Sequence, residues 1–163
     1  MHKILVVSDT HRKDENFYRV VEKESPVNLI IHCGDTEGSE TQMQQLAGAP
    51  MRIVRGNNDF FCNLPDEQVF EVWPHTFFVT HGHRYLVNMG SDEVQREAFA
   101  RGADVVIYGH THRPIAAEID GMYVFNPGSL SYPRQEGRKP SYIVITIDDE
   151  GELSFELKYL DLF

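Results

Sequence analysis

The sequence predicts an α/β fold with a mixed β-sheet system, and two observations support this prediction. In the early part of the chain, short β-branched runs alternate with segments of helical periodicity, the pattern of parallel strands joined by helices. After about residue 108 the chain contains mainly strand patterns separated by turn residues, which is typical of antiparallel hairpins. The length of 163 residues and the apolar fraction of 41% suit one globular domain over residues 1–163.

Strands and helices are expected to alternate first. Continuous apolar runs predict buried strands at residues 4–7 and 29–31, and residues 51–54 are expected to form a third strand. Phe17, Val20 and Val21 recur at helical spacing, and Pro26 should end this helix. A second, short helix is expected over residues 40–47.

A hairpin, a helix and a further buried strand are expected next. Residues 69–73 and 76–79 flank Pro74-His75 and predict an antiparallel pair. Residues 91–101 predict a helix in which Asp92 and Gln95 are spaced as a capping box. The remaining expected strands cover residues 105–108, 116–119, 122–125, 142–147 and 153–159, with turns at 120–121 and 148–151.

Charge and cysteine content exclude several classes of protein. Asp and Glu number 25 against 15 Lys and Arg, and without a basic cluster the chain is not expected to bind nucleic acid. Cys33 and Cys62 could form one disulfide at most, so reduced thiols and a cytoplasmic location are expected. No apolar run approaches the ~20 residues of a membrane span, and Met1 does not begin a signal-peptide pattern, so no membrane partner is expected.

Polar residues of metal-ligand type follow five of the apolar runs. Because ligands bind at the carboxyl ends of strands in open α/β sheets, these side chains are expected at one common edge. The set comprises two Asp, one Asn and four His: Asp9, His11, Asp35, Asn57, His81, His110 and His112.

The residue types and their spacing predict two metal ions. Oxygen and imidazole ligands together suit Mn, Fe or Zn, and the absence of paired Cys argues against a structural zinc site. Seven such side chains exceed the needs of one ion, but they suit two ions ~3.5–4 Å apart that act on a phosphoryl group. In Asp9-x-His11 and His110-x-His112, residues two apart on an extended chain point to the same side.

Five short motifs in order resemble those of the calcineurin-like metallophosphoesterase superfamily. They are Asp9-Thr-His11, Gly34-Asp35, Gly56-Asn57-Asn58-Asp59, His81-Gly-His83 and Gly109-His110-Thr-His112. The compact spacing and the later Asn126-Pro-Gly128-Ser129 resemble the small bacterial and archaeal phosphodiesterases of this superfamily. That branch is related to the retromer subunit, which uses the fold as a scaffold. The resemblance extends from Ile4 to about Ile147.

The resemblance implies a fold, a cofactor and a set of ligands. The fold would be two facing mixed β-sheets flanked by helices. The cofactor would be two divalent ions, with Mn expected first and Ni, Co, Zn or Fe as alternatives. One ion would be held by Asp9, His11 and His112, the other by Asn57, His81 and His110, and Asp35 would bridge both.

Two positions depart from the pattern of the superfamily. Asn58 stands where many members have a His that protonates the leaving group, and an amide cannot supply this proton at neutral pH. Arg12 stands where the family often has Gly, and its guanidinium could hold a phosphate oxygen or narrow the entrance.

Residues near the motifs allow two interpretations each. His83 is expected to line the site without binding metal, while His32 could support the site or be a plain strand residue. Cys33 is expected as a small buried residue rather than a ligand, and Asp59 as a residue that orients a neighbour. The turn 126–129 could lie beside the metals or be an ordinary tight turn.

The sequence therefore predicts a metal-dependent phosphoesterase, and first a phosphodiesterase acting on a small phosphoester. The chain has no motif for a covalent nucleophile, so a hydroxide held between the ions is the expected attacking group, in line with the leaving group. Arg12, His83 and Asn58 are the candidates for contacts at the reacting phosphate. The alternatives are a non-catalytic interaction module on the same fold and, less favoured by the charge, a nucleic-acid-processing enzyme. The sequence is compatible with a homo-oligomer and does not specify the oligomeric state.

Overall fold

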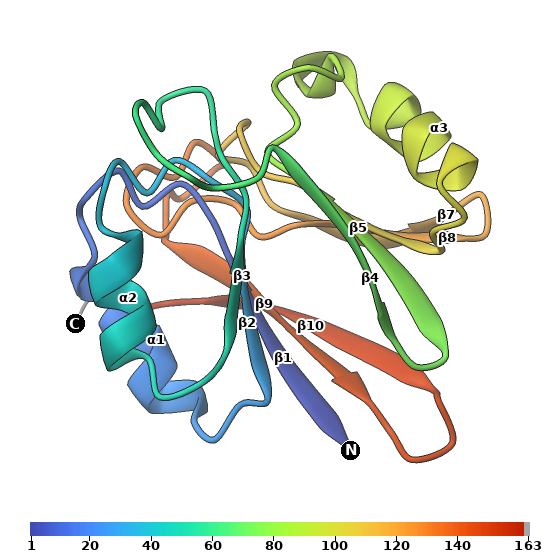
Figure 1. The fold of residues 1–163 in the computed structure, drawn as a ribbon, viewed down its shortest axis with the longest axis horizontal. Helices are drawn as coiled ribbons and strands as arrows, with labels where there is room; N and C mark the ends of the chain where they lie inside the picture. Colours follow the sequence, from blue (N-terminus) through green and yellow to red (C-terminus); the bar gives the residue numbers. More distant parts are fainter. Residues whose placement is uncertain (162–163) are drawn as a thin grey trace.

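The computed structural model describes residues 1–161 and contains two five-stranded sheets that face each other (Figure 1). The first sheet has the order β10 (Leu153–Tyr159), β9 (Ser141–Ile147), β1 (His2–Val7), β2 (Leu29–His32) and β3 (Met51–Ile53). The second has the order β4 (Glu67–Val72), β5 (His75–Thr80), β6 (Val105–Ile107), β8 (Met122–Asn126) and β7 (Ile115–Ile119). This architecture confirms the predicted α/β class and the two facing sheets.

Both sheets are mixed, as predicted. In the first sheet β1 pairs in parallel with β2, and β2 with β3, whereas β9 runs antiparallel to β1 and β10. In the second sheet β6 lies between β5 and β8 and is parallel to both, while β4 and β7 form antiparallel edges. The C-terminal part of the chain thus contributes strands to both sheets.

Three helices cover the outer faces of the sheets. Helices α1 (Glu15–Glu24) and α2 (Glu40–Leu46) lie outside the first sheet, and α3 (Asp92–Ala100) lies outside the second (Figure 1). Strand β1 explains the layering, because Ile4 and Val6 pack between the sheets while Leu5 and Val7 pack toward α1. All four side chains are fully buried.

The predicted capping box of α3 is wrong. Asp92 is the first residue of the helix, and the N-cap is Ser91, whose side chain makes no capping hydrogen bond. The Ser91 hydroxyl instead donates to Oε1 of Gln95 at 2.7 Å, and Nε2 of Gln95 donates to the carbonyl of Ile119. Gln95 therefore bonds to the side chain of the N-cap residue and also ties α3 to the end of β7. Sequence analysis also missed a short 3-10 helix, η1 (Val87–Met89).

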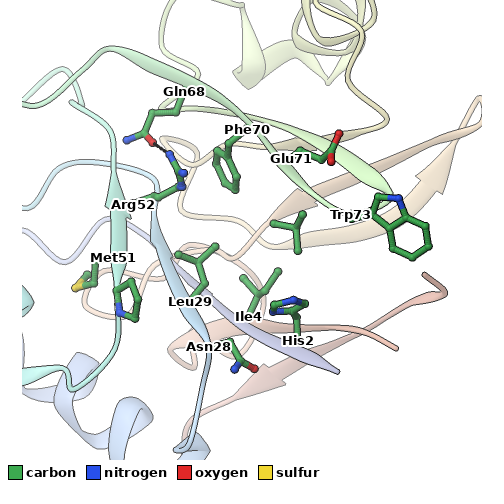
Figure 2. Close-up of a pocket in the computed structure, with 12 residues that line it drawn as sticks. His2, Ile4, Asn28, Leu29, Met51, Arg52, Gln68, Phe70, Glu71 and Trp73 are labelled. Atoms are coloured by element: carbon green, nitrogen blue, oxygen red, sulfur yellow. Dashed lines mark hydrogen bonds between the residues drawn. The ribbon is translucent and has the colours of Figure 1, made fainter. Parts of the chain in front are cut away.

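An open pocket of about 550 Å³ lies between the edge strands β3 and β4 (Figure 2). Leu29, Phe70 and Trp73 supply apolar walls, and Arg52 hydrogen-bonds to Gln68 at its rim. The pocket adjoins His2 at the start of β1, so it lies away from the end of that strand where the predicted ligands follow. None of the predicted site residues lines it.

Within residues 1–161, no helix has both the length and the apolar character needed to cross a membrane.

Candidate metal centre

The predicted ligands follow strand ends of both sheets. Asp9 and His11 follow β1, and Asp35 follows β2, in the first sheet. His81 follows β5, and the pair His110 and His112 follows β6, in the second. Backbone hydrogen bonds join these loops within each sheet, from His11 N to Asp35 O at 2.8 Å and from Gly109 N to His81 O at 3.0 Å.

Five of the predicted residues supply two groups of converging ligand atoms. In one group, the atoms of Asp9, His11 and His112 all lie within 4.8 Å of one another. In the other, the same holds for Asp9, Asp35 and His81. Asp9 belongs to both, and its Oδ1 lies 3.3 Å from His112 Nε2 and 3.8 Å from the Nε2 atoms of His11 and His81.

Two atoms at the centre of these groups are buried without a hydrogen-bond partner. They are Oδ1 of Asp9 and Nε2 of His81, and neither finds a donor or acceptor among the described residues. Buried polar atoms in native proteins are nearly always satisfied, so such a pair needs an explanation. A carboxylate oxygen and an imidazole nitrogen that face each other in this way are a fitting donor set for a divalent cation.

Hydrogen bonds on the far side of two imidazoles orient the candidate ligand atoms. Nδ1 of His81 donates to the carbonyl of Cys33, and Nδ1 of His112 donates to the carbonyl of Tyr132, both at 2.7 Å. Each bond leaves Nε2 as the ring atom that faces the carboxylates, Asp35 and Asp9 in the case of His81 and Asp9 in the case of His112. This is the arrangement that metal-binding histidines use, because the outer bond fixes both tautomer and ring orientation.

The backbone at most candidate ligands is in the left-handed region. Such φ values are uncommon for residues other than glycine and cost energy that surrounding structure must offset, so they concentrate at functional sites. The residues and their φ values are Asp9 (55°), His11 (48°), Asp35 (62°), His110 (73°) and His112 (60°).

Two glycines let the backbone approach the carboxylates. A Cβ at Gly56 would lie 2.1 Å from Oδ1 of Asp35, and one at Gly109 would lie 2.8 Å from Oδ2 of Asp9 and 2.2 Å from Oγ of Ser8. Each would overlap atoms that cannot move without shifting a candidate ligand. The glycines of the two motifs are therefore required for space.

Charge and burial compete at the centre. Burial alone would lower the pKa of His81, but the carboxylates of Asp9 and Asp35 raise it to about 9. Burial alone would raise the pKa of both carboxyls, and the neighbouring imidazoles reverse this, so that both pKa values are lowered. The carboxylates are thus held in the charged form that metal binding requires.

His110 and Asn57 lie outside the two groups. The ring of His110 packs against that of His81 with centroids 5.2 Å apart, and its backbone N donates to Oδ2 of Asp9. Asn57 is exposed, and its side chain makes no hydrogen bond to another described residue. Asn58 contacts the carboxylate instead, donating from its backbone N to Oδ1 of Asp35 at 2.9 Å and from Nδ2 to Oδ2 at 3.1 Å.

His83 and Arg12 border the centre. The ring of His83 lies 5.5 Å from that of His81, and burial lowers its pKa. Nδ1 of His83 is buried without a partner among the described residues. Nε of Arg12 donates to the carbonyl of Glu37, and the side chain lines a pocket with Asn58.

Asp59 and His32 hold the loops that carry the ligands. The carboxylate of Asp59 accepts backbone hydrogen bonds from Asp35 (2.8 Å), Gly56 (2.8 Å) and Glu37 (2.7 Å). Nδ1 of His32 accepts from Gly34 N, so its Nε2 donates to Oγ1 of Thr10 at 3.1 Å. Burial lowers the pKa of His32 to about 4, which keeps the ring neutral. Both residues support the site rather than contribute ligand atoms to either group.

Cys33 and the turn at residues 126–129, for which the sequence allowed two interpretations each, also have defined surroundings. Cys33 packs in the core between the sheets, and burial raises the pKa of its thiol. The turn after β8 lies beside the centre, because Oγ of Ser129 donates to the carbonyl of Asp9 and Nδ2 of Asn126 donates to the carbonyl of Gly109.

Sequence analysis missed several residues that contact candidate ligands, among them Tyr132, whose carbonyl accepts from His112, and also Ser8 and Glu37. Oγ of Ser8 donates to Oδ2 of Asp9 at 2.6 Å, and Oε2 of Glu37 lies 3.6 Å from Nδ1 of His11. Ser8 lies directly before a ligand motif, a position that could have drawn attention to it. Nothing in the local sequence marks Glu37.

Comparison with known proteins identifies relatives over nearly the whole chain. The Calcineurin-like phosphoesterase superfamily domain matches residues 2–150. A probable metallophosphoesterase of Bacillus subtilis is 33% identical over 149 residues, which cover 91% of this chain and 86% of that protein. A phosphodiesterase of Methanocaldococcus jannaschii is 32% identical over 145 residues, covering 77% and 82% of the two chains.

Solved structures share the same architecture. A predicted phosphoesterase from Streptococcus pneumoniae superposes with a TM-score of 0.83 at 28% identity, covering 97% of this chain and 89% of that one. Vacuolar Protein Sorting 29 from Cryptosporidium parvum superposes with a TM-score of 0.76 at 17% identity, covering 98% and 97%, which establishes likeness of fold. The chain belongs to the calcineurin-like phosphoesterase superfamily.

Proposed function

We propose that this protein is a metal-dependent phosphodiesterase that uses two divalent ions. The observation that carries the proposal is the meeting of Asp9, His11, Asp35, His81 and His112 at strand ends of two sheets, with buried ligand atoms that lack partners. Relatives named as probable metallophosphoesterases and phosphodiesterases support a hydrolase of this class.

The chain's own residues fit two ions. Asp9, His11 and His112 would hold one, and Asp35 and His81 the other, where Asp9 also lies within reach. The family resemblance adds His110 and Asn57 as ligands of the second ion. Asp35 would bridge both, and we propose manganese first. Such ions lower the pKa of bound water and neutralise charge on phosphoryl oxygens.

Several side chains would position ligands and substrate. Ser8 holds the second oxygen of Asp9, and the backbone and amide of Asn58 hold both oxygens of Asp35. Arg12 and His83 border the centre and are the candidates for contact with the phosphate. The prediction of a cytoplasmic location rests on the two free cysteines.

An interaction module is the second candidate. Phe60 and Phe61 are exposed, and both line a pocket with Asn58. Exposed aromatic residues suit contact with a protein partner, and a partner bound to Phe60 and Phe61 would cover this pocket.

The test is hydrolysis of bis(4-nitrophenyl) phosphate and 4-nitrophenyl phosphate by protein loaded in turn with Mn, Ni, Co, Zn and Fe. We expect release of nitrophenol from the diester, and its loss after chelation. Absence of turnover with every metal and ester would overturn the enzymatic proposal and favour the interaction module.

A further inference from the structure

Cations without a carboxylate partner gather beside the candidate metal centre. Elsewhere most Lys and Arg side chains pair with an acid within 4.0 Å: Lys3, Arg19, Arg55, Arg84, Arg96, Arg101, Lys139 and Lys158. Among residues 1–161, seven Lys or Arg side chains have no such partner. Lys23 and Arg52 lie elsewhere, and the other five are in the loops near the candidate ligands: Arg12, Lys13, Arg113, Arg134 and Arg138, of which Arg113 follows directly on His112. In a chain of net charge −10, this local positive charge is unusual.

Two of these arginines line a pocket that adjoins one group of candidate ligands. The pocket has a volume of about 650 Å³, and its walls include His11, His112, Tyr132, Arg134 and Arg138. We call it the arginine pocket. A molecule held at His11 and His112 would therefore lie in the same pocket as the two arginines.

The loop that carries the arginines is fixed to the candidate ligands. The backbone N of Arg134 donates to the carbonyl of His112 at 3.0 Å, and Nδ1 of His112 donates to the carbonyl of Tyr132. The next turn closes from Arg138 N to Gln135 O at 3.0 Å. The backbone of Arg134 is thus anchored to a candidate ligand residue, which fixes the point where this side chain leaves the loop.

Glu37 is the one acid among the residues that line the arginine pocket, and the exposed Glu136 lies in the loop between the two arginines. Oε2 of Glu37 lies 3.6 Å from Nδ1 of His11. The two arginines outnumber Glu37 in the pocket, and Lys13 adds a further positive charge, with Nζ 4.7 Å from the centre of the Tyr132 ring. The pocket therefore favours an anion.

We propose that the substrate is a small phosphodiester that carries a second phosphate on one arm, and that Arg134 and Arg138 bind this phosphate. The proposal rests on the proposed function. A guanidinium group can donate two parallel hydrogen bonds to two oxygens of one phosphate. Two exposed arginines at one pocket therefore suit a terminal phosphate better than an uncharged group. The acidic total charge argues against a long polyanion such as RNA.

The test uses two esters with the same leaving group, 4-nitrophenyl 3-phosphopropyl phosphate and 4-nitrophenyl 3-hydroxypropyl phosphate. We expect kcat/KM for the phosphorylated ester to be about 10- to 100-fold higher, the factor that a charge-assisted hydrogen bond supplies. In the double variant Arg134→Gln/Arg138→Gln this ratio should fall to about one. The matched control Arg19→Gln/Arg96→Gln removes two arginines from helices α1 and α3 and should keep the ratio.

Binding provides a readout that does not need turnover. Calorimetry should show that propane-1,3-diphosphonate binds more tightly than propylphosphonate, and that the Arg134→Gln/Arg138→Gln variant loses this difference. Equal kcat/KM for the two esters, with diphosphonate binding unchanged in the variant, would overturn the inference while leaving the phosphodiesterase intact. Faster cleavage of oligonucleotides than of the phosphorylated ester would also overturn it. No turnover of either ester with any metal would contradict the proposed function, and calorimetry would still decide the role of the arginine pocket.

Discussion

Asp35 and His81 follow strands of different sheets, and yet Oδ2 of Asp35 lies 3.3 Å from Nε2 of His81. The same oxygen lies 3.8 Å from Nε2 of His11, which belongs to the other group of candidate ligands. One carboxylate thus faces an imidazole of each group. Its position suits the bridging role that the family resemblance implies.

Replacing Asp35 by Asn should therefore weaken both metal sites. We expect an affinity for Mn at least about 100-fold lower and a comparable loss of diesterase activity, since even residues behind the ligands change metal affinity by 10- to 100-fold. Metal content by mass spectrometry and turnover of bis(4-nitrophenyl) phosphate measure the two effects. Asp149→Asn, at an exposed turn, is the control. Unchanged metal content together with full activity in Asp35→Asn would contradict the bridging role.

His110 and His112 should serve different ions. His112 shares a group of ligand atoms with Asp9 and His11, whereas His110 packs against His81. The variants His112→Ala and His110→Ala should each lose a different metal first, which anomalous scattering from crystals of each variant would reveal. Loss of one common ion in both variants would indicate a mononuclear site.

The rate of hydrolysis should depend strongly on the leaving group. Asn58 cannot protonate the departing oxygen, and a positioned acid commonly contributes ~10²–10⁴ in rate. Aryl diesters should therefore be cleaved much faster than alkyl diesters of similar size, and log kcat/KM should fall steeply with leaving-group pKa. The variant Asn58→His should flatten this dependence. A shallow slope in the unmodified protein would mean that another group, with His83 as the first candidate, supplies the proton.

Removing the carboxylate of Asp59 should destabilise the loops around Asp35. Three backbone N–H groups would lose their acceptor, and each unsatisfied buried donor costs ~1–3 kcal/mol. We expect Asp59→Ala to lower the free energy of unfolding by about 3 kcal/mol or more in urea denaturation. Asp59→Asn keeps one acceptor oxygen and should lose less. An Asp59→Ala variant as stable as the parent would contradict this role.

Stability should decrease in acid because of Glu24. This buried carboxylate accepts hydrogen bonds from Tyr142 at 2.7 Å and from Lys158 at 3.2 Å. Burial alone would raise its pKa, but these partners outweigh burial, and the pKa is lowered from the usual 4.5. Because the folded state favours the charged form, the contribution is fully present above pH 4.5 and is lost as the pH falls through the lowered pKa.

The variant Glu24→Gln tests this contribution. At pH 7 we expect it to be about 3 kcal/mol less stable than the parent, since removing one partner of a buried ion pair is costly. Urea unfolding between pH 3 and 7 should show a smaller pH dependence in the variant. If the free energy of unfolding changed with pH in the same way in both proteins, Glu24 would not contribute to the loss of stability in acid.

Sequence patterns predicted the mixed α/β class and most strands, whereas the two facing sheets were predicted from the family resemblance. Strands buried on both faces leave continuous apolar runs, and β1 is such a strand because each of its faces packs against a different layer. Periodicity carries no information about strand neighbours. The parallel pairing of β8 with β6 depends on tertiary packing of residues far apart in the chain.

The candidate ligands were predictable because metal chemistry restricts residue types, and their motifs are short. The side-chain contacts around the ligands were less predictable, and so were those at the ends of helices. At α3, for example, the expected capping box does not form, because the side chain of Gln95 bonds to Ser91 and to the carbonyl of Ile119 in β7. Likewise, the exposed position of Asn57 and the contact of Asn58 with Asp35 depend on how the loop 56–59 turns.

The centre is assembled from loops of both sheets, and this would link uptake of the proposed ions to completion of the fold. Asp9 and His112 lie at opposite ends of a long stretch of chain, and they meet only when the two sheets have docked. The ions would therefore bind tightly to the folded protein and not to partly folded chains. At a free concentration 100 times their dissociation constant, they would raise the free energy of unfolding by ~2.7 kcal/mol. A cell short of such ions would hold less of this protein, because more of its chains would be open to proteolysis.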